Sequence, residues 1–268
     1  MDGKRINHPL DSRRLGALAL SLHSWGVYLF LYLPVIILII FSFNNSRINA
    51  VWTGFTLEWY KRLLTDGSIF NALKNSLIVG VVSTGIATTI GTLTALAMTR
   101  YNFIGKGAFD SVLHLPIILP DIVMGVSLVT FYVLIHLTLG LISIIIAHVA
   151  FNISFVAVVV RARLHGFDLS LEEAAMDLGA NPIQAFLRVT LPLIAPGVIA
   201  GALIAFTLSF DDFVITFFVA GVGATTLPLK VYSMIKFGVT PEINAISTII
   251  LLVTITLILI VQRLQRSY

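Results

Sequence analysis

The sequence contains no cysteine and few charged residues, and both shortages exclude classes of protein. Of its 268 residues, 11% are charged and 57% are hydrophobic, and the mean hydropathy is +0.98. Without cysteine, neither disulfide bonds nor thiolate chemistry can support structure or catalysis. A chain this apolar has too little polar surface to cover a water-soluble globule, so lipid is its expected solvent.

Motifs for nucleotide binding and catalysis are also missing. The chain has no Gly-x-x-x-x-Gly-Lys-Ser/Thr phosphate loop, no His-Glu-x-x-His zinc motif and no Gly-x-Gly-Asp motif of an intramembrane aspartyl protease. His114, His136 and His148 are far apart and lack metal-ligand spacing. We therefore expect no catalytic residue, no metal site and no cofactor in this chain.

Six segments are long and apolar enough to cross a bilayer as helices, which takes roughly 20 residues each. They are expected at residues 15–46, 75–99, 111–135, about 141–160, about 193–219 and 243–262. The first apolar run exceeds that of a cleavable signal peptide, so we expect it to be retained. The predicted fold class is all-α: one polytopic transmembrane domain over residues 1–268, surrounded by lipid, with no stretch left for a soluble domain.

Basic residues are distributed unequally between the two ends of these helices. Eleven Lys and Arg, among them Lys4 and Arg5, lie on the side that holds both termini, and six, among them Arg47, lie on the other. Because an excess of Lys and Arg marks the cytoplasmic side, both termini are predicted to be cytoplasmic. The same residues are scattered rather than gathered in a patch, so the net charge of +4 does not indicate a nucleic-acid partner.

The polar segment 161–192 lies on the predicted cytoplasmic side and carries helix start and stop signals. Ser170 with Glu173 fits a capping box, Gly179 fits the left-handed residue that ends a helix, and Asn181-Pro182 fits a new helix start. Two short helices with a sharp turn are predicted. The apolar face of the first suits docking in a groove of another protein; its members are Leu171, Ala174, Ala175 and Leu178.

Three carboxylates, Asp121, Asp211 and Asp212, fall inside apolar segments that contain no basic residue. A charge at the bilayer centre costs on the order of 2.5–3.5 kcal/mol, so such residues are usually functional, and an external cation is their natural partner. On an unbroken helix, Asp212 projects into the small-residue face, Asp211 lies at its edge, and we rank Asp212 first, Asp211 second and Asp121 third as residues of a substrate path. That face consists of Gly197, Gly201, Ala205 and Ser209.

Each acid also has a structural explanation. Asp121 follows Pro120, which tends to break a helix, so its carboxylate is a candidate cap for the resumed segment. Asp211 or Asp212 can instead be protonated and hydrogen-bonded within the helix bundle. The sequence leaves these alternatives open.

The cytoplasmic segment resembles the loop of permease subunits of type I ABC importers. That family has the pattern Glu-Ala-Ala, three residues, Gly, nine residues, Ile, one residue, Leu-Pro, and here Val189 stands at the Ile position while the other motif residues match. The resemblance implies that the loop, about residues 161–192, docks a separate ATPase. The implied coupling residues are Glu172, Glu173, Ala174, Ala175, Gly179, Leu191 and Pro192.

Shorter stretches narrow the resemblance to spermidine/putrescine permease subunits; these are residues 43–46, 120–123, 208–212, 226–228 and 241–245. This implies a bacterial inner-membrane protein with a second homologous permease subunit, a dimer of ATP-binding subunits that uses ATP and Mg, and an extracytoplasmic polyamine-binding protein. A permease for ferric ion or phosphonate shares the loop and is the main alternative. An intramembrane aspartyl enzyme or a secondary transporter would leave the docking loop unexplained.

Overall fold

A computed structural model describes residues 9–46, 51–236, 238 and 240–266 of the chain. Within these residues the regular structure is helical, and the only β-type pairing is an isolated bridge between Asn44 and Phe55. The chain forms two compact units, one made of Met1–Asp66 with Met234–Tyr268 and the other of Gly67–Ser233. Lys4, Arg5 and Arg47, which contributed to the predicted orientation, lie outside the described residues.

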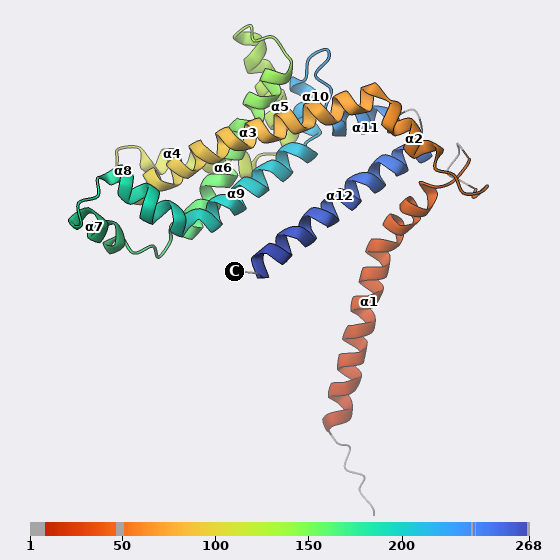
Figure 1. The fold of residues 1–268 in the computed structure, drawn as a ribbon, viewed down its shortest axis with the longest axis horizontal. Helices are drawn as coiled ribbons and strands as arrows, with labels where there is room; N and C mark the ends of the chain where they lie inside the picture. Colours follow the sequence, from red (N-terminus) through yellow and green to blue (C-terminus); the bar gives the residue numbers. More distant parts are fainter. Residues whose placement is uncertain (1–8, 47–50, 237, 239, 267–268) are drawn as a thin grey trace, which may run out of the picture. The chain divides into compact units, whose positions relative to one another are not determined.

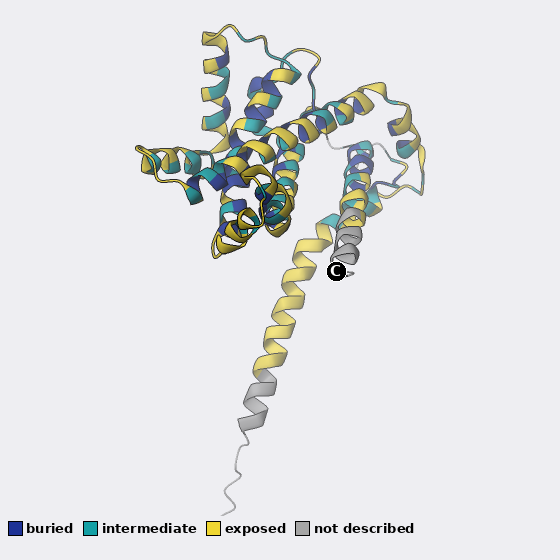
Figure 2. Cartoon of the chain, turned by 60° about the vertical axis from the view of Figure 1, so that its left-hand side comes forward, coloured by how far each residue is buried: buried dark blue, intermediate teal, exposed yellow. Residues whose placement is uncertain are grey.

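The first unit contains α1 (Pro9–Phe41), α2 (Glu58–Thr65) and α12 (Pro241–Arg266), and α12 packs against both others. From Gly16 onward most of α1 is exposed, as expected of an apolar helix whose solvent is lipid (Figure 2). The link between α1 and α2 is tied to α2: Trp59 Nε1 donates to the Asn44 carbonyl at 2.7 Å, and the Ser42 and Tyr60 hydroxyls are hydrogen-bonded at 2.6 Å.

The second unit is built on three long helices that pack side by side (Figure 1): α3 (Gly67–Arg100), α6 (Leu141–Leu164) and α9 (Leu191–Asp211). Their shared core includes Ala95, Val156, Val160, Ile194 and Ala205. All four members of the predicted small-residue face of α9 are buried, so that prediction is confirmed. The shorter elements of this part of the chain are α4 (Lys106–Ile118), α5 (Asp121–Leu134), α7 (Ser170–Asp177), α8 (Pro182–Ala185), a π-helical turn η1 (Phe186–Thr190), α10 (Val214–Val219) and α11 (Leu227–Ile235).

Two of the predicted membrane spans are broken. A break after Pro120 was one of the alternatives that the sequence left open, whereas the unbroken helix expected through Asp212 was wrong. The chain bends by 113° between α4 and α5, and Pro120, which lacks a backbone N–H and disfavours helix at Leu119, explains this break. The second break separates α9 from α10 at Asp212, whose ψ of 123° is extended, and no proline is present there.

The described helices agree with most of the predicted spans. Four are long and apolar enough to cross a membrane, and the bent pair α4–α5 makes a fifth. α12 contributes a shorter apolar stretch, Pro241–Thr256, among its described side chains. The number of six crossings remains a prediction.

Candidate functional site

The turn that ends α7 has the predicted geometry. Gly179 has a φ of +94°, the Gly179 N–H donates to the Met176 carbonyl at 2.9 Å, and the Ala180 N–H donates to the Ala175 carbonyl at 3.1 Å. A Cβ on Gly179 would meet no atom within 4 Å, so backbone conformation, and not space, requires glycine here.

The two predicted helix starts in this loop have different outcomes. Asn181 caps α8 as predicted: its Oδ1 accepts from the Gln184 N–H at 2.9 Å, and its own N–H donates to Gln184 Oε1 at 3.1 Å. The capping box predicted for Ser170 and Glu173 is wrong, because Asp168 Oδ1 accepts from the Ser170 N–H at 3.0 Å. Hydrogen bonds from Ser170 hold the pKa of the Asp168 carboxyl below its ordinary value. An aspartate two residues before the helix competes well for that amide.

Glu172 links the loop to the long helices. Its carboxylate is paired with Arg100, the last residue of α3, and accepts a hydrogen bond from the hydroxyl of Thr190 in η1. Thr190 is fully buried, whereas the neighbouring Glu173 is exposed. The Glu172 carboxylate therefore attaches α7 to two other elements of the second unit.

The remaining predicted coupling residues lie around this attachment. Ala174 is exposed and Ala175 is half-buried, while Leu191 and Pro192 form the first turn of α9. Large apolar side chains on the loop are also exposed, including Leu178 at 91%. An apolar surface left open on two short helices is suited to contact with another protein.

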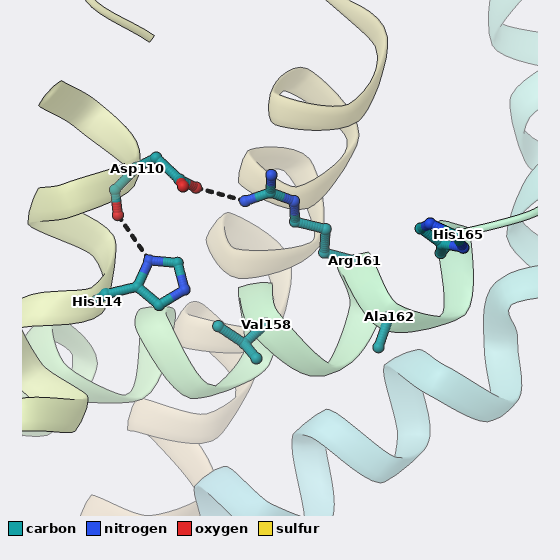
Figure 3. A pocket seen from close by; sticks show the side chains of 6 residues that line it. All are labelled: Asp110, His114, Val158, Arg161, Ala162 and His165. Carbon is teal, nitrogen blue, oxygen red and sulfur yellow. Dashed lines mark hydrogen bonds and ion pairs between the residues drawn. The ribbon is translucent and has the colours of Figure 1, made fainter. Parts of the chain in front are cut away.

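A hollow of about 650 Å³ lies between α4 and α6 (Figure 3). Its Asp110 carboxylate is paired with Arg161, and the ring of His114 is hydrogen-bonded to the Asp110 backbone oxygen at 2.7 Å. Because its only carboxylate is already paired with a guanidinium, this hollow offers no free anion to a cationic ligand. The other lining residues are Val158, Ala162 and His165.

The three acids predicted to line a path all lie at the two helix breaks. Asp121 is the first residue of α5 and follows its N-cap residue, Pro120. Asp211 is the last residue of α9. Both are exposed in the chain, and among the described residues neither carboxylate has a hydrogen bond or an ion pair. The structure thus presents two unpaired carboxylates at interruptions of apolar helices.

The two breaks belong to one packed region, because α5 and α10, the segments that follow them, lie against each other. A Cβ on Gly125 of α5 would approach the Phe218 ring to 2.6 Å, which shows that this side chain of α10 packs directly on the α5 backbone. Unwound segments between half-helices are where membrane transporters commonly place charged ligands.

Asp212 is in a different environment from Asp211. Its Oδ1 accepts from the Ile215 N–H at 3.3 Å, and its Oδ2 accepts from the N–H and the hydroxyl of Thr216, each at 2.7 Å. His148 Nε2 lies 3.3 Å from the same Oδ2. Both carboxylate oxygens are therefore engaged within the chain, at the start of α10.

His148 was not recognised as part of this region from the sequence. It lies on α6, is fully buried, and is hydrogen-bonded through Nδ1 to the Ser209 hydroxyl at 2.6 Å. Its partners are more than 60 positions away along the chain, so local spacing could not reveal them. The available signal was that an ionisable residue inside a membrane segment usually pairs with another one.

Comparison with known proteins assigns the chain to a family. The family model described as the binding-protein-dependent transport system inner membrane component matches residues 87–268. The spermidine/putrescine transport system permease protein PotC of Escherichia coli strain K12 is 44% identical over 242 residues, which cover 90% of this chain and 92% of that protein. The putrescine transport system permease protein PotI of the same organism is 43% identical, covering 84% of this chain and 82% of that protein.

Solved structures show the same fold at lower identity. A chain from a bacterial ABC transporter involved in the import of the acidic polysaccharide alginate has a TM-score of 0.76 and 18% identity, covering 98% of this chain and 99% of that chain. A chain from a bacterial alginate ABC transporter in complex with an alginate pentasaccharide-bound periplasmic protein has a TM-score of 0.67 and 19% identity, with 90% coverage of each chain. The family model, which matches more than half of the chain, and the relatives above 40% identity show that the chain belongs to the family of inner membrane components of binding-protein-dependent transport systems.

Proposed function

We propose that this chain is a permease subunit of an ABC importer for polyamines such as spermidine and putrescine. The observation that carries the proposal is the pair of exposed, unpaired carboxylates, Asp121 and Asp211, at two helix breaks in one packed region. The two relatives are named as polyamine permeases, and this chain matches each of them over most of its length, which supports the same cargo.

The chemistry of the cargo fits two separated acids. A polyamine carries at least two ammonium groups along a flexible chain, and each can meet one carboxylate while it gives up water. Separate, weak contacts favour passage, whereas one strong site would trap the cargo. Asp212 contributes differently: with both of its oxygens engaged, it shapes the break and leaves Asp211 and Asp121 as the residues that meet the cation.

Coupling is assigned to the loop at residues 161–192. Its exposed apolar residues dock on a separate dimer of ATP-binding subunits, which supplies ATP and Mg chemistry that this chain lacks, and the Gly179 turn sets the angle between its two short helices. The same proposal includes a second homologous permease subunit, an extracytoplasmic polyamine-binding protein, and a bacterial inner membrane with both termini in the cytoplasm.

The test is cargo uptake by the reconstituted importer in proteoliposomes with radiolabelled spermidine and putrescine. Changing both Asp121→Asn and Asp211→Asn removes two charges at nearly constant volume and should reduce uptake at limiting cargo by about tenfold. Assembly and ATP hydrolysis should persist. The matched control is Glu58→Gln, which removes an exposed acid whose partner, Arg62, is one turn away on α2.

Normal uptake by the double variant would contradict the assignment of these acids to the path. Competition with ferric ion or a phosphonate tests the cargo itself. If either of these, and no polyamine, competes for uptake, the polyamine proposal fails while the permease assignment stands.

A further inference from the structure

The break between α9 and α10 needs something to hold it, because it contains no proline. An interrupted helix in an apolar environment leaves backbone N–H groups without partners, and each unpaired group is costly. Asp212 supplies acceptors for the N–H groups of Ile215 and Thr216. A carboxylate buried in this way is itself costly unless it is further hydrogen-bonded.

His148, on α6, completes that set of bonds and links α3 to both sides of the break. Its Nε2 lies 3.3 Å from Asp212 Oδ2 and 3.1 Å from the Thr216 hydroxyl, and its Nδ1 lies 2.6 Å from the Ser209 hydroxyl. The Ser209 hydroxyl is in turn 3.0 Å from that of Ser83 on α3. The chain of bonds therefore runs from α3 through α9 and α6 to the first turn of α10.

The carboxylate at one end fixes the direction of the bonds nearest to it. An ionised carboxylate only accepts, so the Thr216 hydroxyl donates to Asp212 Oδ2, and the Thr216 oxygen accepts from His148 Nε2–H, which also lies near that carboxylate. His148 Nδ1 and the Ser209 hydroxyl share the next hydrogen bond, and the Ser209 and Ser83 hydroxyls share the last one. Both ring nitrogens of His148 are therefore engaged, Nδ1 with a residue of α9 and Nε2 with a residue of α10.

Asp211 immediately precedes this anchored residue. Because the extended Asp212 fixes where α9 ends, it also fixes the direction in which the last residue of α9 points. The Asp211 side chain is exposed and makes no hydrogen bond or ion pair among the described residues, so its direction follows from the backbone at the end of α9.

We propose that His148 is a positioning residue for transport: by holding Asp212 and Ser209, it fixes the break after α9 and directs the Asp211 carboxylate toward the cargo. The proposal rests on the proposed role of Asp211 in the cation path. It assigns His148 a role in transport without contact with cargo, since its side chain is fully buried.

Three substitutions separate this role from simple packing. His148→Gln keeps an N–H donor near the position of Nε2 and can still reach Asp212. His148→Asn keeps a polar group near the position of Nδ1 and can reach only Ser209. His148→Leu keeps volume and removes both bonds. Under this proposal, transport is highest in His148→Gln, lower in His148→Asn and lowest in His148→Leu.

The first measurement needs no transport. Because the native chain has no cysteine, Asp211→Cys gives this subunit a single thiol, and a cationic methanethiosulfonate reagent reports how accessible position 211 is. His148→Leu should change the labelling rate at position 211 severalfold, and His148→Gln should restore it. Asn102→Cys, in the exposed link between α3 and α4, is the control whose labelling should not respond.

The second measurement is cargo moved per ATP hydrolysed in proteoliposomes. His148→Leu should lower this ratio by about tenfold, since a small misplacement of a contacting group is enough for such a loss. Complex recovery and binding-protein-stimulated ATP hydrolysis should persist. In the Asp211→Asn background, His148→Leu should cause no further loss, because the group that it positions is already gone.

The outcomes distinguish the two proposals. If Asp211→Asn transports normally, the cation-path assignment is wrong. If Asp211→Asn impairs transport but His148→Leu leaves both the labelling rate and the transport ratio unchanged, only the positioning role is wrong. If His148→Leu lowers assembly, ATP hydrolysis and transport together and His148→Gln does not restore them, His148 is a packing residue and the positioning role is again wrong.

Discussion

The loop after α6 and the break after α9 each contain two adjacent acids, and in each pair one is engaged and the other is free. In the loop, Glu172 binds Arg100 and Thr190, while Glu173 is exposed. At the break, Asp212 binds His148 and the start of α10, while its neighbour is exposed. Glu172 and Glu173 are consecutive in α7 and so point about 100° apart, whereas Asp211 and Asp212 diverge because the helix ends between them.

The environments of the two engaged acids differ. The side chains of Glu172 and Arg100 are 12% and 23% exposed, so water still reaches this ion pair. His148 is 1% exposed and Asp212 9%, and here the partner is an imidazole together with backbone N–H groups. Replacing the acid should therefore cost much more at the break, where water cannot substitute for the lost acceptor.

The largest effect is expected from Asp212→Ala. It leaves the Ile215 and Thr216 N–H groups and the Thr216 hydroxyl without their acceptor, so we expect a loss of about 3 kcal/mol in stability, from a lost cap plus buried unpaired donors. Asp211→Ala should change stability by less than about 0.5 kcal/mol, since its side chain is exposed and unpaired. Thermal unfolding of the purified complex, followed by size-exclusion chromatography, measures both.

Equal melting points for the two alanine variants would show that the break does not depend on Asp212. A double variant with His148→Leu sharpens the test. Because the two side chains share one network, the combined loss should be smaller than the sum of the single losses.

The loop after α6 could be predicted from the sequence better than the break after α9. The turn at Gly179 and the start of α8 at Asn181 were predicted because glycine at a left-handed position and an Asn-Pro cap act through bonds within a few residues. The break at Pro120 also has a local cause, and it was one of the alternatives that the sequence left open, although the apolar run that continues across it was counted as one span. Hydropathy reports that a segment lies in lipid, and it does not report whether the helix is continuous.

The break at Asp212 could not be predicted from local signals. An unbroken helix was assumed there, which placed Asp212 on the small-residue face as the first candidate for the path. The bonds that hold the break come from His148 on another helix, and such long-range pairs leave no periodic trace in a single sequence. The sequence singled out the three acids, and their part in a substrate path remains a proposal; the difference between the environments of Asp211 and Asp212 required coordinates.

An intermediate effect is expected from Glu172→Ala. It leaves the buried Thr190 hydroxyl without its acceptor and Arg100 without its partner, so the loop should be held more weakly by about 1.5 kcal/mol. Glu173→Ala, the matched control, should leave the loop attached. Amide hydrogen exchange of residues 170–178 in the intact complex measures this; equal protection in both variants would mean that the Glu172 attachment does not hold α7.

The smallest effect is expected from Asp168, which caps α7 much as Asp212 caps α10 but does so in full contact with water. Hydrogen bonds from Ser170 lower the pKa of the Asp168 carboxyl. The cap therefore stabilises the start of α7 fully at pH values above the ordinary carboxyl pKa, and this stabilisation is lost only as the pH falls through the lowered pKa. Exchange protection at the start of α7 should therefore stay constant from about pH 5 to pH 8 and fall only below about pH 4. Asp168→Ala should lower the protection slightly at neutral pH and abolish its pH dependence. Asp168→Asn, which keeps a neutral acceptor, should retain the protection and also lose the pH dependence. If Asp168→Ala lowered the protection as much as Glu172→Ala does, exposure to water would not reduce the stabilisation that a hydrogen-bonded carboxylate contributes.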